Sequence, residues 1–258
     1  MTSSLNDIFE KPSQSKAVSL PSIDQNEFIK VIETRRSVRQ FTNEPIPDQV
    51  MDQCLDLALL APNSSNLQAW EFYWIKDSVK RKKLNEAFLS QPAATTAAEI
   101  IVSIARTKTW KKNSAEMIKR FNEQNPNPPK AVYEYYTKLV PFAYTVGFFN
   151  LLGLFKKILL DTIGIKKPIP REPVSESQLQ IWAVKSAALA CENLMLSMRA
   201  LGYDTCPMEG FDSVRIKKLL NLPKDAVIVM GIACGKRAPG GVYGPQVRFQ
   251  RDWFIKKI

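Results

Sequence analysis

Three arginines and a serine near residue 37 form a dense cluster of anion-binding side chains. They occur within five residues, in the order Arg35-Arg36-Ser37-x-Arg39. Guanidinium groups stay charged, and their planar fork of N–H donors matches the oxygens of a phosphate. The cluster predicts a phosphate site or, as the plainer alternative, a solvated helix end that carries three cations.

A second polar cluster contains short amide and hydroxyl side chains. Its sequence is Pro62-Asn63-Ser64-Ser65-Asn66-x-Gln68-x-Trp70. These side chains offer both donors and acceptors, which suits the edge of a heteroaromatic ring. The alternative is an ordinary turn between two elements.

A third cluster precedes a predicted helix and reads Cys206-Pro207-Met208-Glu209-Gly210-Phe211-Asp212. Proline fixes an extended approach, glycine lets the backbone come close to a ligand, and a helix N-terminus follows. The alternative is a loop that merely caps the next helix.

The composition excludes several kinds of catalytic site. The chain has no histidine, so it contains no Ser-His-Asp triad, no Cys-His pair and no histidine-ligated metal. Its four cysteines include no C-x-x-C pair, and they are expected to be buried thiols of a protein in a reducing compartment. No metal site is predicted. An enzyme with this composition would depend on a cofactor for its chemistry.

Taken together, the three clusters resemble the motifs of the nitroreductase family of FMN-dependent oxidoreductases. That family carries R-(R/H)-S-x-(R/K), then P-x-S-x-N-x-Q-P-W, and then a P-x-E-G-(F/Y)-D loop after a long central helix. All three occur here in that order, with Ala69 in place of the proline of Q-P-W. The resemblance covers about residues 26–105 and 177–250.

The resemblance implies a set of FMN-binding residues. The first motif would hold the phosphate, the ribityl chain and the pyrimidine edge through Arg35, Arg36, Ser37 and Arg39. The second would reach the flavin of the other subunit of a homodimer through Pro62, Asn63, Ser64 and Asn66. The third would lie against the isoalloxazine ring through Pro207, Met208, Glu209 and Gly210.

Three further assignments follow from the same resemblance. Glu209 and Gly210 would be the catalytic positions. Arg248 matches the arginine that completes the phosphate site, with Lys236 and Arg237 as the nearest substitutes, and Gln91 matches an amide near the flavin pyrimidine.

The implied activity is reduction of nitroaromatic, quinone-like or enone acceptors by a ping-pong mechanism, with tightly bound FMN and NAD(P)H as transient co-substrate. The sequence has no G-x-G-x-x-G after a strand, which argues against a permanent dinucleotide site. Two alternatives remain: a specialised flavin-dependent dehalogenase or flavin-fragmenting enzyme of the same fold, and a flavin-binding module that docks on anionic surfaces without turnover.

The elements that must position these residues predict an α+β fold. We expect a nitroreductase-like mixed central sheet flanked by helices, with the long central helix at a homodimer interface. Apolar residues three and four apart predict helices, and β-branched or aromatic runs predict strands. Helices are expected from Asp24 to about residues 35–39, from Asp48 until Pro62 ends the helix, at 80–89, at 177–201 and from 212. Strands are expected at 70–75, 100–104 and 226–233.

The domain prediction is a flexible arm over residues 1–22 and a single FMN-binding domain over 23–258, with an insertion at about 106–171. The insertion holds 13 basic and four acidic residues, so it contributes +9 of the total charge of +11. No nucleic-acid-binding module is recognisable, and the charge favours a face beside an anionic cofactor, a substrate or a membrane surface.

An apolar stretch from Leu139 to Ile165 within the insertion is expected to be helix-like. It could be a core or interface segment, or a lid over the flavin pocket of the dimer. A peripheral contact with a membrane surface is a less favoured alternative, and a spanning helix is disfavoured because Pro141 and Gly147 interrupt it. The protein is expected in the cytoplasm.

Overall fold

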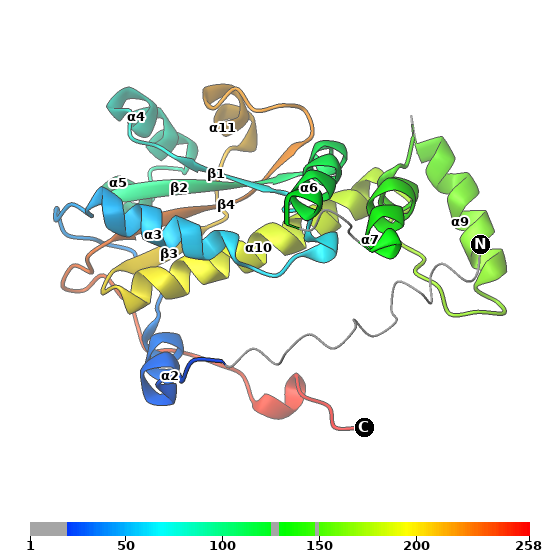
Figure 1. Ribbon diagram of the computed structural model, residues 1–258. Coiled ribbons are helices and arrows are strands. Elements are labelled where there is room, and N and C mark those ends of the chain that lie inside the picture. Colours follow the sequence, from blue (N-terminus) through cyan, green and yellow to red (C-terminus); the bar gives the residue numbers. More distant parts are fainter. Residues whose placement is uncertain (1–19, 125–128, 148–149) are drawn as a thin grey trace.

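The computed structural model describes residues 20–124, 129–147 and 150–258, so most of the predicted arm at 1–22 falls outside the described residues. A four-stranded sheet forms its centre (Figure 1). The strands are β1 (Trp70–Trp74), β2 (Glu99–Arg106), β3 (Asp204–Met208) and β4 (Ala226–Gly235), in the order β1-β2-β4-β3.

The α+β prediction is confirmed, but every pairing between these strands is antiparallel, so they do not form the mixed sheet that we expected. A parallel pairing does occur as an isolated bridge between Ser37 and Thr205. Continuously apolar strands are typical of parallel sheets because both faces are covered. Here an antiparallel sheet is covered on both faces by helices, so its strands have the same apolar sequence.

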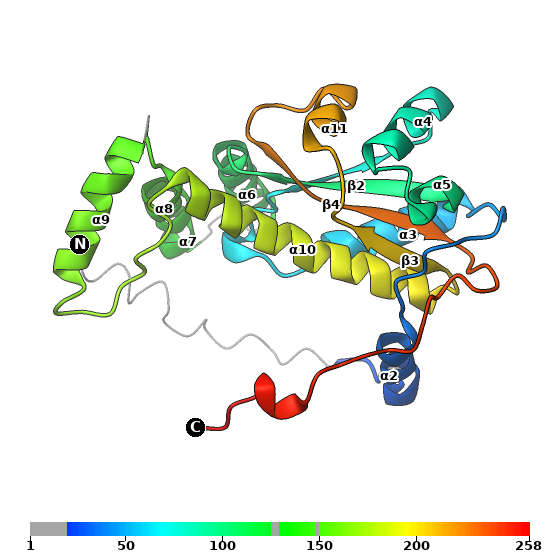
Figure 2. The same cartoon turned by 180° about the vertical axis from the view of Figure 1, so that it is seen from behind.

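Helices form a layer on each face of the sheet (Figures 1 and 2). Ile101 packs with Cys191 and Leu194 towards one layer, whereas Ile100 and Val102 point to the core on the other side, as the alternation of a strand requires. The first layer contains α3 (Asp48–Leu59) and α10 (Glu176–Ala200), and the second contains α4 (Ser78–Ala87), α5 (Pro92–Thr96) and α11 (Ser213–Leu219).

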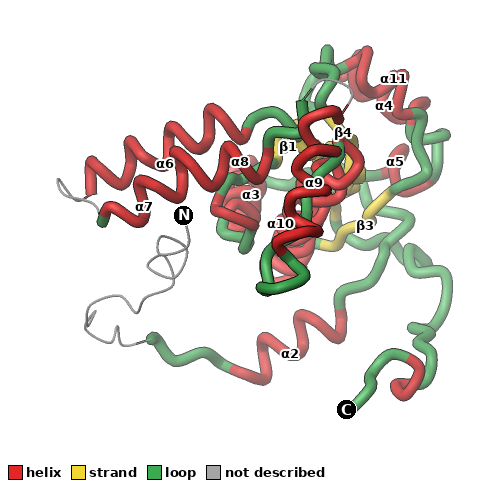
Figure 3. Tube along the Cα trace, turned by 90° about the vertical axis from the view of Figure 1, so that its right-hand side faces the viewer, coloured by secondary structure: helices red, strands yellow, loops and turns green. Residues whose placement is uncertain are grey.

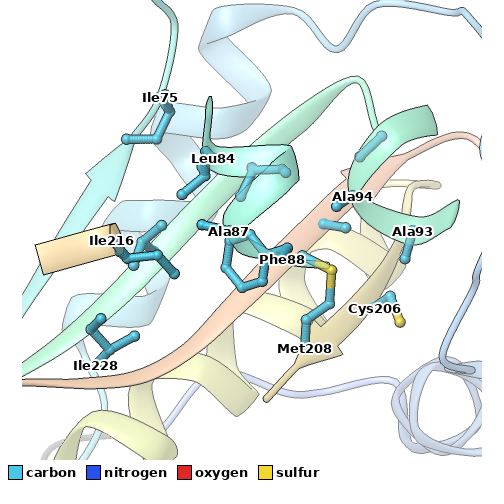
Figure 4. Close-up of a cluster of buried hydrophobic side chains, with 14 of the residues drawn as sticks. Ile75, Leu84, Ala87, Phe88, Ala93, Ala94, Cys206, Met208, Ile216 and Ile228 are labelled. Carbon is cyan, nitrogen blue, oxygen red and sulfur yellow. The ribbon is translucent and has the colours of Figure 1, made fainter. Parts of the chain in front are cut away.

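Phe88, at the end of α4, fills the core between the second helical layer and the sheet (Figure 4). Its ring packs edge-on against Phe211, with 5.9 Å between the ring centroids. A Cβ atom at Gly231 would lie 2.2 Å from the Phe88 ring, so glycine is required there for close approach. This packing supports the end of β3 beneath Met208 (Figure 4).

Strand β3 was expected to be a loop. It is five residues long, begins with Asp204 and contains Pro207. It lies at the edge of the sheet and pairs with β4 on one side, which is where a sheet tolerates proline. Its extended structure therefore depends on β4, a partner that local sequence does not reveal.

Local capping signals placed the helix ends well. Helix α2 (Gln25–Thr34) starts at Asp24, whose carboxylate accepts hydrogen bonds from the N–H groups of Asn26 and Glu27. Helix α10 runs for 25 residues from a cap at Ser175, within one residue of the prediction. Its buried side faces the sheet, but Ile181 and Leu189 are exposed on the opposite side.

The insertion forms a series of helices at one end of the sheet, with α6 and α7 projecting away from the strands (Figure 3). The elements are α6 (Trp110–Gln124), α7 (Lys130–Glu134), a π-helical turn (Tyr135–Leu139), α8 (Val140–Tyr144) and α9 (Leu151–Ile163).

The apolar stretch from Leu139 to Ile165 is not one continuous helix. Helix α8 ends at Tyr144, and Gly147 has a φ of +73°, a left-handed conformation that breaks the helical path. Val140 and Tyr144 are buried, as expected for a core segment, whereas most of α9 is exposed. Among the described residues, no helix is both long and apolar enough to cross a membrane.

A narrow face of α9 attaches it to the rest of the chain. The Lys156 ammonium is buried and donates hydrogen bonds to the carbonyl oxygens of Phe142 and Ala143, at 3.2 and 2.7 Å, which caps the last turn of α8. A Cβ atom at Gly153 would lie 1.9 Å from the carbonyl oxygen of Val174, so the backbones touch there.

All four cysteines are buried free thiols, as predicted. Burial raises the pKa of Cys54 and Cys191 to about 11, and it raises the pKa of Cys234 beyond the normal range for a thiol. Burial also raises the pKa of Cys206, against the opposing effect of two nearby arginines.

Candidate functional site

The first motif leaves α2 and runs beside strand β3. Arg35 ends the helix with extended backbone, at φ −63° and ψ 126°. Ser37 then forms the parallel bridge to Thr205, and the Val38 N–H donates to the Thr205 carbonyl oxygen at 3.0 Å. The arginine cluster is therefore fixed to the edge of the sheet, next to the third motif.

A cavity of about 220 Å³ lies between this segment and residues 242–248. Arg36 donates to the carbonyl oxygen of Gly244 at 2.6 Å, and the Arg39 guanidinium lies 5.7 Å from the centre of the Tyr243 ring. The cavity is lined by Arg35, Arg36, Ser37, Arg39 and the segment from Val242 to Arg248. The structure thus brings Arg248 to the predicted phosphate-binding residues.

The cavity carries an excess of positive charge. In the part of the chain that the structure describes, the guanidiniums of Arg36, Arg39 and Arg248 have no carboxylate within 4.0 Å, and Arg35 has one weak partner, Glu192, at 4.0 Å. Four cations with one distant counter-ion favour the binding of an anion in this cavity.

The substitutes considered for Arg248 are engaged elsewhere. Arg237 donates from two nitrogens to both carboxylate oxygens of Asp204, at 2.7 and 3.2 Å. Lys236 donates to the carbonyl oxygen of Gly202 at 2.9 Å. Neither residue lines the cavity, so Arg248 is the stronger candidate.

The third motif begins on the same edge of the sheet. Arg39 and Arg35 lie near Cys206 of β3, close enough to oppose the rise in pKa that burial causes at that thiol. Beyond β3, Gln91 at the start of α5 donates to the carbonyl oxygens of Phe88 and Gly210, at 3.1 and 3.2 Å. Gln91 is therefore placed beside the predicted flavin loop.

The loop that follows β3 is held at one end by the pairing of Met208 with Gly231 of β4, and at the other end by Asp212. The Asp212 N–H donates to the Ala87 carbonyl oxygen at 2.8 Å, and the Asp212 carboxylate caps α11. Glu209 and Gly210 lie between these anchors and are exposed. Their backbone can therefore face a ligand without disturbing the core.

The second motif lies elsewhere in the chain. Pro62 and Asn63 lead into a 3-10 turn (Ser64–Asn66), in which Ser65 and Asn66 have left-handed φ angles of 57° and 47°. The Asn63 side-chain oxygen accepts a hydrogen bond from the Gln68 N–H at 2.8 Å. This turn borders a second cavity of about 970 Å³ between α3 and α6.

Three tyrosines of the insertion hold this turn. The Tyr135 hydroxyl lies 2.7 Å from Ser65 Oγ, the Tyr144 hydroxyl lies 3.2 Å from Ser64 Oγ, and the Tyr136 hydroxyl donates to the Ser65 carbonyl oxygen at 3.0 Å. The sequence analysis missed these residues. The available signal was a group of tyrosines in an otherwise basic and apolar insertion.

The Ser64–Asn66 turn and the arginine cluster lie near opposite ends of α10. The Tyr144 ring packs on Trp182 near the N-terminal end, with 4.5 Å between ring centroids, while Arg199 at the other end donates to the Thr34 hydroxyl at 2.9 Å. Trp182 and Arg199 are 17 positions apart in the helix, which corresponds to about 25 Å at 1.5 Å per residue. One chain therefore brings together the first and third motifs but not the second.

The sequence profile of the nitroreductase family matches residues 32–236. The chain belongs to the nitroreductase family. The predicted family is thereby confirmed, and with it the prediction of an NAD(P)H-dependent flavin oxidoreductase with FMN as cofactor.

One relative is similar to this chain in sequence, and two solved structures share its fold. Protein DrgA of Synechocystis is 30% identical over 210 residues, which cover 80% of this chain and 83% of that protein. A nitroreductase-like protein from Streptococcus mutans superimposes with a TM-score of 0.70, at 20% identity, over 91% of this chain and all of that one. An NADPH:FMN oxidoreductase from Vibrio harveyi, solved in complex with NAD+, superimposes with a TM-score of 0.60. It is 19% identical, and the match covers 90% of this chain and 77% of that one.

Proposed function

We propose that the arginine-lined cavity holds the phosphate end of FMN. Its volume of about 220 Å³ is below the roughly 300–1,000 Å³ of typical small-molecule pockets, so it suits a phosphate and the adjoining chain rather than a whole flavin. Charge-assisted hydrogen bonds from Arg35, Arg36, Arg39 and Arg248 would hold it. The convergence of these four guanidiniums carries the proposal.

The isoalloxazine ring would lie along Pro207–Gly210, which begins on the same sheet edge as the arginines. When bound, FMN supplies the redox chemistry by taking a hydride from NAD(P)H and passing it to the acceptor. The protein would position the ring. Gln91 fixes the Gly210 carbonyl, and the nearby arginines favour the negative charge of the reduced ring. Glu209 and Gly210 are the proposed catalytic positions.

A second copy of the chain would complete each site. The Pro62–Asn66 turn is too far from the arginine cavity to reach the same flavin within one chain. Apolar side chains are exposed where a partner could cover them, including Ile181 and Leu189 on α10 and Phe28 on α2. We therefore propose a homodimer with two flavin sites at its interface.

The proposed reaction is the two-electron reduction of nitroaromatic, quinone-like or enone acceptors by a ping-pong mechanism. The nicotinamide and the acceptor would use the same exposed flavin face in turn, because no separate dinucleotide motif exists in the sequence. Dehalogenation and flavin fragmentation on the same fold are the nearest alternatives.

Anaerobic titration of the FMN-loaded protein with NADH or NADPH tests the proposal. We expect the flavin absorbance to bleach and, with a nitroaromatic or quinone acceptor, parallel double-reciprocal plots. A flavin that neither nicotinamide can bleach would instead indicate a binding module without turnover. Bleaching followed by preferential loss of halide from a haloaromatic acceptor would indicate the dehalogenase.

A further inference from the structure

Helix α9 presents an apolar face that the rest of the described chain does not cover. Its exposed apolar side chains include Leu151, Leu154, Phe155, Ile158, Leu159 and Ile163. Residues at three- and four-residue spacing share one face of a helix, so these side chains form a continuous surface. Phe155, the largest of them, is 69% exposed.

The contacts that attach α9 to the rest of the chain leave this apolar face pointing outwards. Gly153 and Lys156 are the buried positions of the helix, and they attach it to the backbone at Val174 and at the end of α8. Both views in Figures 1 and 2 place α9 at the end of the molecule, beyond the N-terminal end of α10 and away from α2. The face is thus remote from α2, and none of its side chains is among those proposed for the homodimer surface.

The charge around α9 is strongly positive. Residues 150–171 contain five basic residues and one acidic residue, Asp161. That carboxylate is already paired with Lys157 and Arg171, at 2.5 and 2.7 Å. Lys166 and Lys167 follow the helix and are exposed. An apolar helical face flanked by uncompensated lysines is complementary to an anionic surface with an apolar interior.

We propose that α9 is an in-plane anchor that docks the protein on anionic lipid bilayers. The helix has 13 residues, about 20 Å, which is too short to span the hydrocarbon core but suits insertion at the level of the headgroups. A second copy of the chain is a poorer occupant, because a two-fold contact would set the same net-positive segment against itself. This inference goes beyond the proposed reaction and does not depend on it.

Co-sedimentation of the full chain with sucrose-loaded vesicles tests the proposal. We expect the protein to pellet with vesicles that contain one-third phosphatidylglycerol and to stay in solution with pure phosphatidylcholine. The double variant Phe155→Glu/Ile158→Glu should lower the partition coefficient about tenfold or more, because two buried apolar groups are lost. Lys166→Glu/Lys167→Glu should lower the partition coefficient about 30-fold or more.

The matched control is Val79→Glu/Val214→Glu, which adds the same charge at exposed apolar positions on α4 and α11. It should pellet like the natural sequence, and circular dichroism should show all variants folded. The proposal is wrong if the natural sequence does not pellet with either kind of vesicle, or if the α9 variants and the control variant pellet to the same extent. It is also wrong if the natural sequence forms an assembly larger than a dimer that Phe155→Glu/Ile158→Glu dissolves, since α9 would then be a protein interface.

Discussion

The sheet-centred part of the chain and the inserted helices use apolar residues in opposite ways. Around the sheet, helices on both faces leave Phe88, Met51 and Leu194 fully buried. In the insertion, α9 exposes most of its apolar side chains and is attached through a few specific contacts such as Lys156. The first part is held by collective packing throughout. The insertion combines a packed core around Tyr136, Val140 and Tyr144 with α9, which is attached by individual hydrogen bonds and close backbone approaches.

Matched glycine variants should separate the two parts most clearly. Gly231→Ala sets a Cβ atom 2.2 Å from the Phe88 ring, so we expect a loss of about 3 kcal/mol in the free energy of unfolding. Gly153→Ala sets a Cβ atom 1.9 Å from the Val174 carbonyl oxygen, but should release α9 at a global loss of about 1 kcal/mol or less.

Denaturant unfolding and hydrogen exchange over residues 151–163 measure these effects. Gly244→Ala is the control, because a Cβ atom there meets nothing within 4 Å. Equal global destabilisation by Gly231→Ala and Gly153→Ala would show that the insertion folds as one unit with the sheet.

Substitution of Arg248 tests whether the arginine-lined cavity at the edge of the sheet binds FMN. Arg248→Ala should weaken FMN binding by about 1.5–3 kcal/mol, roughly 10- to 150-fold in Kd, because one charge-assisted hydrogen bond is lost while three arginines remain. Flavin fluorescence titration measures the change. Arg215→Ala, which removes an exposed arginine of α11, should bind FMN normally. An unchanged Kd for Arg248→Ala would remove Arg248 from the site.

The rate of NAD(P)H oxidation should depend more on the backbone of the flavin loop at Gly210 than on the carboxylate of Glu209. A Cβ atom at Gly210 meets nothing closer than Leu89 Cδ1 at 4.0 Å, so Gly210→Val should fold normally. It should nevertheless slow NAD(P)H oxidation about tenfold, or 1.4 kcal/mol, by obstructing the ring. Glu209→Gln should slow it less. Stopped-flow reduction compares the two, and a larger effect of Glu209→Gln would give the carboxylate a direct role.

The smallest expected effect concerns the contact between the two parts. Tyr135→Phe removes the hydroxyl that lies 2.7 Å from Ser65 Oγ, and should reduce the free energy of unfolding by about 1 kcal/mol. Chemical denaturation measures this, with the exposed neighbour Tyr133→Phe as the control. If both variants behave alike, the tyrosine does not hold the Ser64–Asn66 turn.

Sequence reasoning succeeded where the determinants are local. Asp24 and Asp212 cap the helices that they were predicted to begin. Prediction from the sequence failed where an element or side chain depends on a contact with residues distant in the sequence. Strand β3 needs β4 to become a strand, and the tyrosine contacts join residues about 70–80 positions apart. The direction of strand pairing was likewise hidden, because burial on both faces gives the same apolar pattern in either orientation.

The buried cysteines have a consequence for the lifetime of the protein. Reduced flavins that meet oxygen release hydrogen peroxide, which attacks thiolates rather than thiols. With a pKa of about 11, Cys54 and Cys191 are ionised in roughly one molecule in ten thousand at pH 7. Cys206, on the strand that leads to the proposed flavin loop, is buried and has a raised pKa as well. The enzyme therefore presents few thiolates to peroxide, and its cysteines resist conversion to sulfenic acids and intermolecular disulfides.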